Sequence, residues 1–341
     1  MSFSAPDVAI DLGTTNTLVY VKGRGIVIRE PTLVVVDGEK RDRVLYVGDE
    51  AGYRLGRTRD ASEVIRPVRG GEIIDFNTAK VMIRYFLRKA IGTNHLIRPR
   101  VLLSVPASLP ALSRRALYEA VTVAGVRKIF TVEKALAAAI GSGLPVYESI
   151  GSMVVDIGGG TTDTAIVSLG GMVVSQSVDV GGNRMDDAIV SYLKTYSSML
   201  IGDRTAEQVK IDLASAMPPE ENRYVHVRGR DLLSTHAMDV EFTTAQAYEA
   251  VREPCTAILA SVKWVLERTP PELAADIMRN GIHLTGGASQ IARLDRFIAT
   301  STGIPVLVAR EPADCTILGL GYLLENQDLL EGLQVLSAKT A

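Results

Sequence analysis

The chain has 341 residues, of which 47% are hydrophobic and 22% are charged. This length is more than one ordinary hydrophobic core accommodates and predicts two domains, while the composition excludes an intrinsically disordered chain. The formal net charge of −2 gives no overall attraction to a polyanion, so we expect no nucleic-acid partner.

Neither the cysteines nor the histidines of the chain have the spacing of a metal site. Cys255 and Cys315 are far apart and the four histidines are scattered, which is typical of a protein in a reducing cytoplasm. The N-terminal residues MSFSAPDVAIDLG include no basic segment followed by a long apolar one, so no signal peptide is predicted. Because no run of about 18 apolar residues occurs, we expect no membrane-spanning helix.

Two segments of the chain share one plan, VAIDLGTTNTLVYV (residues 8–21) and VVDIGGGTTDTAIV (residues 154–167). Each has a buried apolar strand, an aspartate, a tight Gly/Thr turn and a second strand rich in β-branched residues, which predicts a β-hairpin. The separation of the two copies is the length of a domain and too long for a solenoid repeat. The repeat therefore predicts two similar domains that face each other across a cleft.

The other predicted elements follow in chain order. Strands are expected at GIVIRE, PTLVVVDG and VLLSVP in the first half, and at MVVSQSVDVGG and GIHLTGG in the second. Helical periodicity predicts helices over residues 77–92, 113–124, 185–196, 205–215, 244–268 and 288–300. The alanine-rich segment TVEKALAAAIG (residues 131–141) is interpreted as the start of another helix, and polar, turn-rich segments at 34–60 and 216–242 predict two small peripheral subdomains. Strands and helices in both halves indicate an α/β class.

The two Gly/Thr turns are candidate phosphate-binding loops. Glycines let the backbone approach a ligand, successive N–H groups form a concave anion site, and threonine hydroxyls add donors. The aspartate before each turn is a suitable partner for hydrated Mg²⁺. One such turn is common in hairpins, but two in matching contexts are a stronger signal. The candidate residues are Asp11, Gly13, Thr14, Thr15 and Asn16 in the first turn, and Asp156, Gly158, Gly159, Gly160, Thr161 and Thr162 in the second.

Two further segments have a functional and a purely structural interpretation. The glycines of HLTGGASQIARLDRF follow a strand and open a helix, either as a plain turn or as backbone that packs against a ring or a phosphate. In TAEQVKIDLASA, Glu207 and Lys210 lie three apart on one helical face, which by itself indicates a surface salt bridge.

The order of DLGTTNT, DIGGGTTD, TAEQVK and LTGGAS resembles the actin/Hsp70/sugar-kinase ATPase superfamily. Longer segments such as IRPVRGGEIIDF, RPRVLLSVPASL and GSMVVDIGGGTTDTAIVSLGGMVVSQSVDVGGNRMDDAI are most similar to the MreB/Mbl bacterial actins. The resemblance covers residues 7–328 and implies an actin-like two-domain α/β fold with four subdomains around a central nucleotide cleft. Domain I is expected at residues 1–145 plus 310–341, with its small subdomain at about 33–65. Domain II is expected at 146–309, with its small subdomain at about 183–243.

The same resemblance implies ATP or ADP with Mg²⁺ as ligands. Carried over by motif, the two Gly/Thr turns would hold the phosphates, and Asp11 and Asp156 would hold Mg²⁺ through water. Glu207 and Lys210 would contact the ribose and the adenine instead of forming a surface salt bridge. The adenosine wall would consist of Gly286, Gly287 and Ala288, the last standing where the family usually has a third glycine.

The chain departs from the family pattern in TVEKALAAAIG, where members usually have two acidic residues followed by proline. The second acid is the one expected to orient the attacking water, and in this chain that position is Lys134. An ammonium donates hydrogen bonds and cannot accept them, so Lys134 cannot act as a base, although it could pair with a γ-phosphate. A cation at a helix N-terminus also opposes the macrodipole, so we expect something to offset it.

Three neighbouring residues complete the predicted catalytic set. Glu133 is adjacent to Lys134, but neighbouring helical residues point about 100° apart, so we do not expect it to substitute simply. Asp163 follows Thr162 in the second loop, where the family usually has Glu, and would keep a carboxylate near the phosphate. We therefore expect ATP hydrolysis to be slow or absent, and we expect the alanine run to let this helix pack closely between the two halves.

The resemblance also implies self-assembly into filaments that lie on the inner face of the cell membrane, determine cell shape and guide wall synthesis with cell-wall elongation proteins. From the N-terminal residues we expect no counterpart of the family's N-terminal amphipathic helix. The family's apolar anchor loop matches GTNHLIRPR, where Leu96 and Ile97 stand beside arginines, a combination that suits an anionic lipid surface. The alternative is that both side chains pack inside the protein.

Four function classes are compatible with this superfamily. The first is a cytoskeletal polymer with a weak or absent ATPase, and the second is a hydrolysis-deficient paralogue that acts as a scaffold or co-polymer. A small-molecule kinase would need a carboxylate base beside a sugar-sized pocket, and no segment suggests one. A chaperone would need a substrate-binding domain, and we expect the residues after the last motif to be too few for it.

Overall fold

Two five-stranded sheets form the centre of the fold in the computed structural model, which describes residues 7–40, 43–54, 62–92 and 98–332. The first sheet has the strand order β10-β9-β1-β2-β3, and the second has the order β13-β12-β11-β17-β18. In each sheet the three strands that are consecutive in the chain pair antiparallel, and the remaining pairs are parallel. The same topology is therefore used twice, and the predicted hairpins are confirmed.

The first sheet consists of β1 (Asp7–Leu12), β2 (Asn16–Val21), β3 (Gly25–Pro31), β9 (Arg100–Val105) and β10 (Lys128–Glu133). The second consists of β11 (Ser152–Ile157), β12 (Thr162–Ser168), β13 (Gly171–Val178), β17 (Ile282–Thr285) and β18 (Val306–Val308). Every residue of β1 and of β11 is buried, because each strand lies inside its sheet with both faces covered. The aspartate near the end of each of these strands, Asp11 in β1 and Asp156 in β11, is consequently buried.

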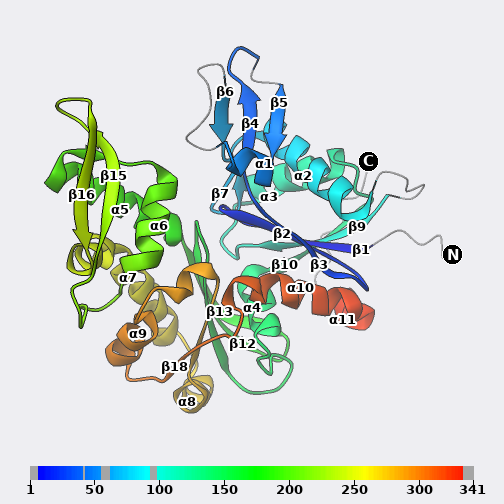
Figure 1. Ribbon diagram of the computed structural model, residues 1–341. Helices are drawn as coiled ribbons and strands as arrows, with labels where there is room; N and C mark the ends of the chain where they lie inside the picture. The colour runs from blue at the N-terminus through cyan, green and yellow to red at the C-terminus, as the bar shows by residue number, and fades with distance from the viewer. Residues whose placement is uncertain (1–6, 41–42, 55–61, 93–97, 333–341) are drawn as a thin grey trace.

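Helices α2 (Phe76–Ile91) and α3 (Ala111–Val123) pack against the first sheet and share one core with β1 and β9 (Figure 1). Helix α2 begins after the N-cap residue Asp75, whose side chain accepts a 2.9 Å hydrogen bond from the backbone N–H of Thr78. The predicted boundaries of both helices lie within two residues of those observed.

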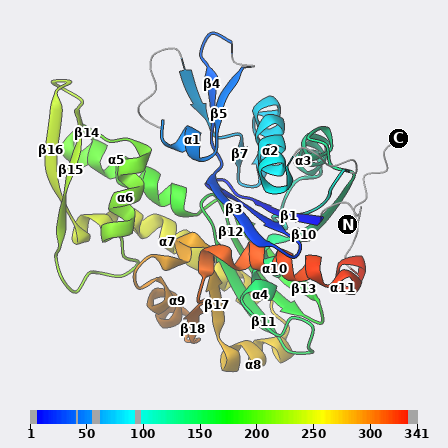
Figure 2. The ribbon, with the colours of Figure 1, turned by 45° about the vertical axis from the view of Figure 1, so that its right-hand side comes forward.

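Helices α4 (Lys134–Gly141) and α10 (Cys315–Glu325) cross each other between the two sheets (Figure 2). A Cβ atom on Gly141 or on Gly319 would overlap the backbone of the opposite helix, so both positions need glycine for this close crossing. Ala137 packs with α10 and the first sheet, whereas the other alanines of α4 pack with the second sheet. The expectation that the alanine run lets this helix pack between the halves is confirmed.

Five further α-helices lie between β13 and β18 in the chain. They are α5 (Gly182–Ser197), α6 (Asp203–Leu213), α7 (Thr244–Glu267), α8 (Pro271–Asn280) and α9 (Leu294–Thr302). Helix α7 begins with a capping box, in which Thr243 and Gln246 satisfy each other's backbone N–H groups. It packs against β12 and β13 and closes the second core.

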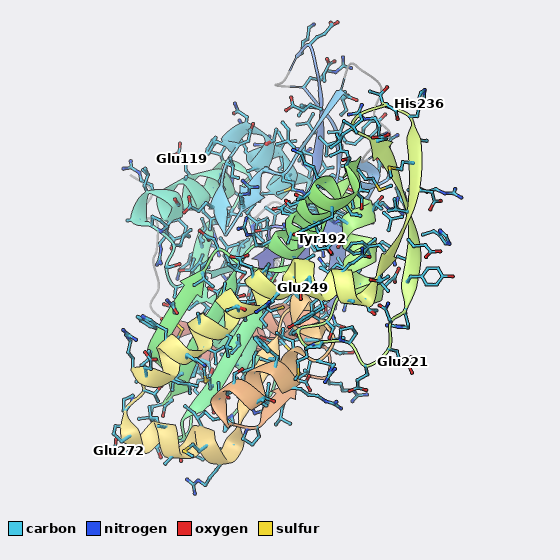
Figure 3. All side chains as sticks on the ribbon, turned by 90° about the vertical axis from the view of Figure 1, so that its left-hand side faces the viewer. Glu119, Tyr192, Glu221, His236, Glu249 and Glu272 are labelled. Atoms are coloured by element: carbon cyan, nitrogen blue, oxygen red, sulfur yellow. The ribbon has the colours of Figure 1, made fainter. Side chains whose placement is uncertain are left out.

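Two small antiparallel sheets project from the two halves toward the same side of the molecule (Figure 1). One consists of β4 (Val34–Asp37), β5 (Val44–Val47) and β6 (Ser62–Ile65), beside α1 (Asp49–Gly52). The other consists of β14 (Met199–Leu200), β15 (Tyr224–Asp231) and β16 (Ala237–Thr243). The second small sheet is fixed to α5 through Tyr192, labelled in Figure 3, whose ring lies edge-on to Phe242 at 5.8 Å. Both segments were predicted as peripheral subdomains from their turn-rich sequences.

The remaining elements are short. They are β7 (Val68–Arg69), β8 (Glu72–Ile73), the 3₁₀ turns η1 (Gly287–Gln290) and η2 (Pro312–Asp314), and α11 (Gln327–Gly332). Within the described ranges no helix is both long and apolar enough to cross a membrane.

Two sequence predictions need correction. The helix expected over 288–300 is instead η1 followed by α9, which begins at Leu294, because Arg293 has a positive φ angle of 62° that interrupts an α-helical path. The helix expected from residue 131 begins at Lys134, since the three residues before it complete β10. The domain boundaries stay predictions, and parts of the expected small subdomain at 33–65 lie outside the described residues.

Candidate functional site

A cavity of about 1130 Å³ lies between the two halves and is lined by both Gly/Thr turns. This is slightly above the roughly 300–1,000 Å³ typical of small-molecule sites. The fold brings every residue predicted to bind the ligand, except Thr162 of the second turn, into its wall. These are Asp11, Gly13, Thr14, Thr15, Asn16, Asp156, Gly158, Gly159, Gly160, Thr161, Glu207, Lys210, Gly286, Gly287 and Ala288.

The two turns have the same backbone closure. In the first, the N–H of Gly13 donates to the carbonyl of Asn16 at 3.1 Å, and in the second the N–H of Gly158 donates to the carbonyl of Thr161 at 2.9 Å. Both turns begin where a fully buried strand ends and a second strand of the same sheet starts. The sequence repeat thus produces two similar backbone cradles at one cavity, an arrangement suited to an extended anion.

The two turns also contact each other across the cavity floor. A Cβ atom on Gly159 would overlap Oγ1 of Thr15, and one on Gly160 would overlap Oγ1 of Thr14. The hydroxyl of Thr15 donates to Oδ1 of Asn183 at 3.0 Å, at the start of α5. Glycine in the second turn is therefore what allows the threonines of the first to come close, and the contact connects the two halves directly.

Lys134 brings a positive charge to this contact. It is the first residue of α4, and its Nζ lies 3.4 Å from Oδ2 of Asp156. The two side chains are only 14% and 2% exposed. The other carboxylate oxygen of Asp156 accepts a 2.9 Å hydrogen bond from Oγ1 of Thr285. An ammonium at the mouth of α4 is thus held inside the cavity wall by a buried carboxylate.

The surrounding charges keep Lys134 protonated. Burial lowers the pKa of the ammonium, but the carboxylates of Asp156, Asp11 and Asp163 raise it more, so that it lies above its ordinary value. The unfavourable interaction of a cation with the positive end of a helix is typically about 0.3–1 kcal/mol. The carboxylate of Asp156 offsets this unfavourable interaction, as the sequence analysis expected of some neighbouring group.

Three residues of the predicted catalytic set are not part of the cavity wall. Glu133 ends β10 and is the N-cap of α4. Thr162 is fully buried, and its hydroxyl donates to the carbonyl of Val180 at 2.7 Å. Asp163 is buried in β12 opposite Asp156, and its carboxylate accepts a 3.0 Å hydrogen bond from Oγ1 of Thr161. Burial raises the pKa of Asp163 to about 6, against the opposing effect of Lys134. Their roles in hydrolysis stay predictions.

On the opposite wall, Lys210 of α6 is paired with a residue that the sequence did not single out. Its Nζ lies 2.8 Å from a carboxylate oxygen of Asp186 in α5 and donates to the carbonyl of Gly182 at 3.1 Å. Lys210 is therefore anchored to α5, whereas Glu207 lines the cavity one turn earlier in α6. Burial raises the pKa of Asp186 to about 6, against the opposing charge of Lys210.

The third glycine-rich turn closes this wall. A side chain on Gly286, which has a φ of 82°, would overlap the backbone of Ile157 at the end of β11. The methyl group of Ala288 and the ammonium of Lys210 both face Gly182, where an added Cβ would lie 3.5 Å and 3.2 Å from them. The alanine in place of a third glycine thus fits within ordinary packing distances.

The structure identifies polar side chains of the candidate site that sequence reasoning missed. Ser104 donates to Oδ1 of Asp11 at 2.6 Å, and Thr285 donates to Oδ1 of Asp156 at 2.9 Å. Ser104 is the polar residue of the otherwise apolar segment VLLSVP, and this was the available signal for it. Asp186 and Asn183 carried no such signal, because their partners come from distant segments of the chain.

The predicted Mg²⁺ does not fit the side chains present. No group of three or more His, Cys, Asp or Glu residues suited to a metal ion occurs in the part of the chain that the structure describes. The carboxylate of Asp156 that would hold the metal's water already faces the ammonium of Lys134. Two like unit charges about 4 Å apart repel by about 4 kcal/mol at an effective dielectric constant of about 20, and a divalent ion is repelled twice as strongly.

The predicted membrane residues Leu96 and Ile97 lie outside the described residues. Arg98, which follows them, lines a small separate cavity between α2 and α3 together with Arg84 and Arg88.

The chain matches the family model described as MreB/Mbl protein over residues 5–332. It is 44% identical to the cell shape-determining protein MreB of Escherichia coli (strain K12) over 331 residues, 96% of this chain and 95% of that protein. It is 40% identical to the cell shape-determining protein Mbl of Bacillus subtilis (strain 168) over 326 residues, 96% and 98% of the two chains. Among solved structures it is similar to MreB5 of Spiroplasma citri bound to ADP, with a TM-score of 0.90, 31% identity and coverage of 97% and 99%.

Proposed function

This chain belongs to the MreB/Mbl protein family, and from that premise we propose that it is a nucleotide-binding cell shape-determining protein that assembles with itself into filaments. The predicted fold class is confirmed, since the chain has the actin-like α/β fold with two sheet cores around a cleft. The observation that carries nucleotide binding is the pair of matching backbone cradles at one cavity.

The ligand is proposed to be ATP or ADP. Solved structures of the similar MreB5 are described as bound to ADP and to AMPPNP. In this chain the backbone N–H groups of the two turns are proposed to hold the phosphates. Lys210 and Glu207 of α6 would contact the nucleoside, and the turn Gly286–Ala288 would pack against it. The predicted Mg²⁺ is not part of this proposal, because Asp156, one of the two carboxylates predicted to hold it, is already paired with Lys134.

Hydrolysis is proposed to be slow or absent. A water molecule that attacks the γ-phosphate needs a hydrogen-bond acceptor in line with it. Lys134 has no lone pair while protonated, and its charge is stabilised by Asp156. Asp163 is buried behind the second turn and is not in the cavity wall. The second candidate function, a hydrolysis-deficient scaffold or co-polymer, is favoured by the same observation.

Filament formation, peripheral binding to the inner face of the cell membrane and contacts with cell-wall elongation proteins are proposed from family membership. Exchange of Leu96 and Ile97 for serine is expected to abolish pelleting with anionic liposomes and to leave nucleotide binding unchanged. Pelleting that persists would remove this segment as the anchor.

The test combines binding, assembly and turnover. Isothermal titration of the full chain should show saturable one-to-one binding of both ADP and AMPPNP, and electron microscopy should show filaments with nucleotide. Phosphate release should stay far below the rate of a relative with the acidic residue, and Lys134→Glu should raise it. Absence of nucleotide binding would overturn the proposal, and rapid phosphate release by the wild-type chain would overturn its hydrolytic part.

A further inference from the structure

The ammonium of Lys134 lies where the charges of the site converge. It faces Oδ2 of Asp156 at 3.4 Å, and it is also within the field of Asp11 and Asp163. A Cβ atom on Gly158 would lie 3.2 Å from Nζ, so the ammonium is directly beside the backbone of the second turn. One side chain therefore contacts both the acidic residues behind the turns and the backbone that would hold a phosphate.

The ammonium also forms an ion pair with a buried carboxylate oxygen that makes no hydrogen bond among the described residues. Oδ2 of Asp156 is buried and makes no hydrogen bond among the described residues, and the ion pair with Lys134 is the interaction that neutralises it. Asp11 and Asp156 each accept a hydroxyl hydrogen bond on Oδ1, from Ser104 and Thr285, so the ammonium is what distinguishes the second turn. The positive charge is accordingly concentrated on the second turn, at the end of the cavity where the two turns meet.

In many nucleotide sites a divalent cation, and not a lysine, lies between acidic side chains and the phosphates. Such an ion neutralises phosphate oxygens and is held by acidic side chains, usually through water. An ammonium is also a phosphate partner, acting as a compact point charge with three donors. Asp156 engages one side of the Lys134 ammonium, and the side toward Gly158 faces the cavity.

We propose that Lys134 is a built-in cation that takes the place of a divalent metal ion, so that this chain binds nucleoside diphosphates and triphosphates without Mg²⁺. The inference rests on the proposed nucleotide site and specifies its ionic requirement. It also gives the lysine a positive role in binding, in addition to the loss of an acceptor for hydrolysis.

The first experiment measures the Kd of ADP for the full chain by isothermal titration, with Mg²⁺ and with excess EDTA. The wild-type Kd should change by less than about threefold between the two conditions. Lys134→Gln should weaken binding in EDTA by about tenfold or more relative to its own value with Mg²⁺. Lys210→Gln is the matched control, since it removes a cation from the other wall and should weaken binding equally in both conditions.

A second experiment observes the metal directly and does not depend on a variant that folds poorly. Mn²⁺ is titrated into the wild-type chain saturated with ADP, and bound ion is measured by electron paramagnetic resonance. The wild-type complex should hold no more Mn²⁺ than the same concentration of free ADP does. Lys134→Glu, which replaces the ammonium by a carboxylate, should gain one tightly bound ion.

The outcomes separate this inference from the proposed function. Binding of ADP that is lost about tenfold or more in EDTA, or one tightly bound Mn²⁺ in the wild-type complex, would overturn the built-in cation and leave the nucleotide site standing. Failure to bind ADP in either condition would overturn the nucleotide site itself.

Discussion

The two Gly/Thr turns have nearly the same backbone and very different electrostatic surroundings. Each follows a fully buried strand and closes with one hydrogen bond between the same relative positions. Asp11 is opposite Leu18 in its hairpin and accepts from the hydroxyl of Ser104. Asp156 is opposite a second carboxylate, Asp163, and faces an ammonium. The repeat therefore supplies the symmetric shape of the site, and the differences between the copies supply its charge.

The two turns also differ in the size of the side chains that they present to each other, and the reason is steric. The first turn presents the side chains of Thr14 and Thr15, and the second presents Gly159 and Gly160 to them. Two identical turns would collide where they meet. The two turns can come this close because the second has glycines where the first has threonines.

The largest expected effect comes from breaking the charge pair of the second turn. Lys134→Met should lower the free energy of unfolding by about 3 kcal/mol, because it leaves the buried carboxylate of Asp156 without a counter-charge. The double variant Lys134→Met with Asp156→Leu should recover most of that loss. Urea denaturation followed by circular dichroism measures both, and a double variant no more stable than the single one would contradict the pairing.

A smaller effect is expected from filling the space between the turns. Gly160→Ala should lower the free energy of unfolding by about 2 kcal/mol and weaken ADP binding, because its methyl group would overlap Thr14. Gly171→Ala is the matched control, since no atom lies within 4 Å of an added Cβ there. If both variants melt at the same temperature and bind ADP equally well, the turns do not make the contact described.

The matching hydroxyls of the two halves allow a direct comparison. Ser104→Ala and Thr285→Val each remove a hydrogen bond to a buried carboxylate and should each cost about 1.5 kcal/mol of unfolding free energy. Denaturant titration of the two variants side by side tests whether the halves are supported equally. A loss confined to one of them would show that the other aspartate relies on different partners.

The smallest expected effect is a dependence of stability on pH that originates in the second half. The pKa of Asp163 is raised to about 6, so between about pH 4 and pH 6 the folded chain binds more protons at this residue than the unfolded chain does. Its contribution therefore increases stability as the pH falls, by about 1 kcal/mol from pH 7 to pH 5.

Asp163→Asn should remove that part of the pH dependence. The measurement is the difference in unfolding free energy between pH 7 and pH 5 for the wild type and for the variant. Identical pH profiles would indicate that Asp163 is already ionised in the folded chain at pH 5.

Local chemistry explains what could be predicted from the sequence. Turn residues, β-branched strands and helical periodicity are short-range signals, and they predicted both hairpins and the ends of α2, α3, α5, α6 and α7 within three residues. The same signals failed for α10, which is buried almost all round and contains two glycines, so it has no polar face to give a period. They also failed at Arg293, where a positive φ angle interrupts the helical path.

The sequence by itself determined the backbone of the binding motifs, because each motif is a contiguous stretch whose geometry is set by its own glycines and threonines. Only the tertiary structure decided the charges of the site. It paired Lys134 with Asp156 and Lys210 with Asp186, and it placed Asp163 behind the turn. Such pairings join residues from separate elements, and Coulomb interactions in a buried site depend on distance and exposure, which no spacing along the chain reveals.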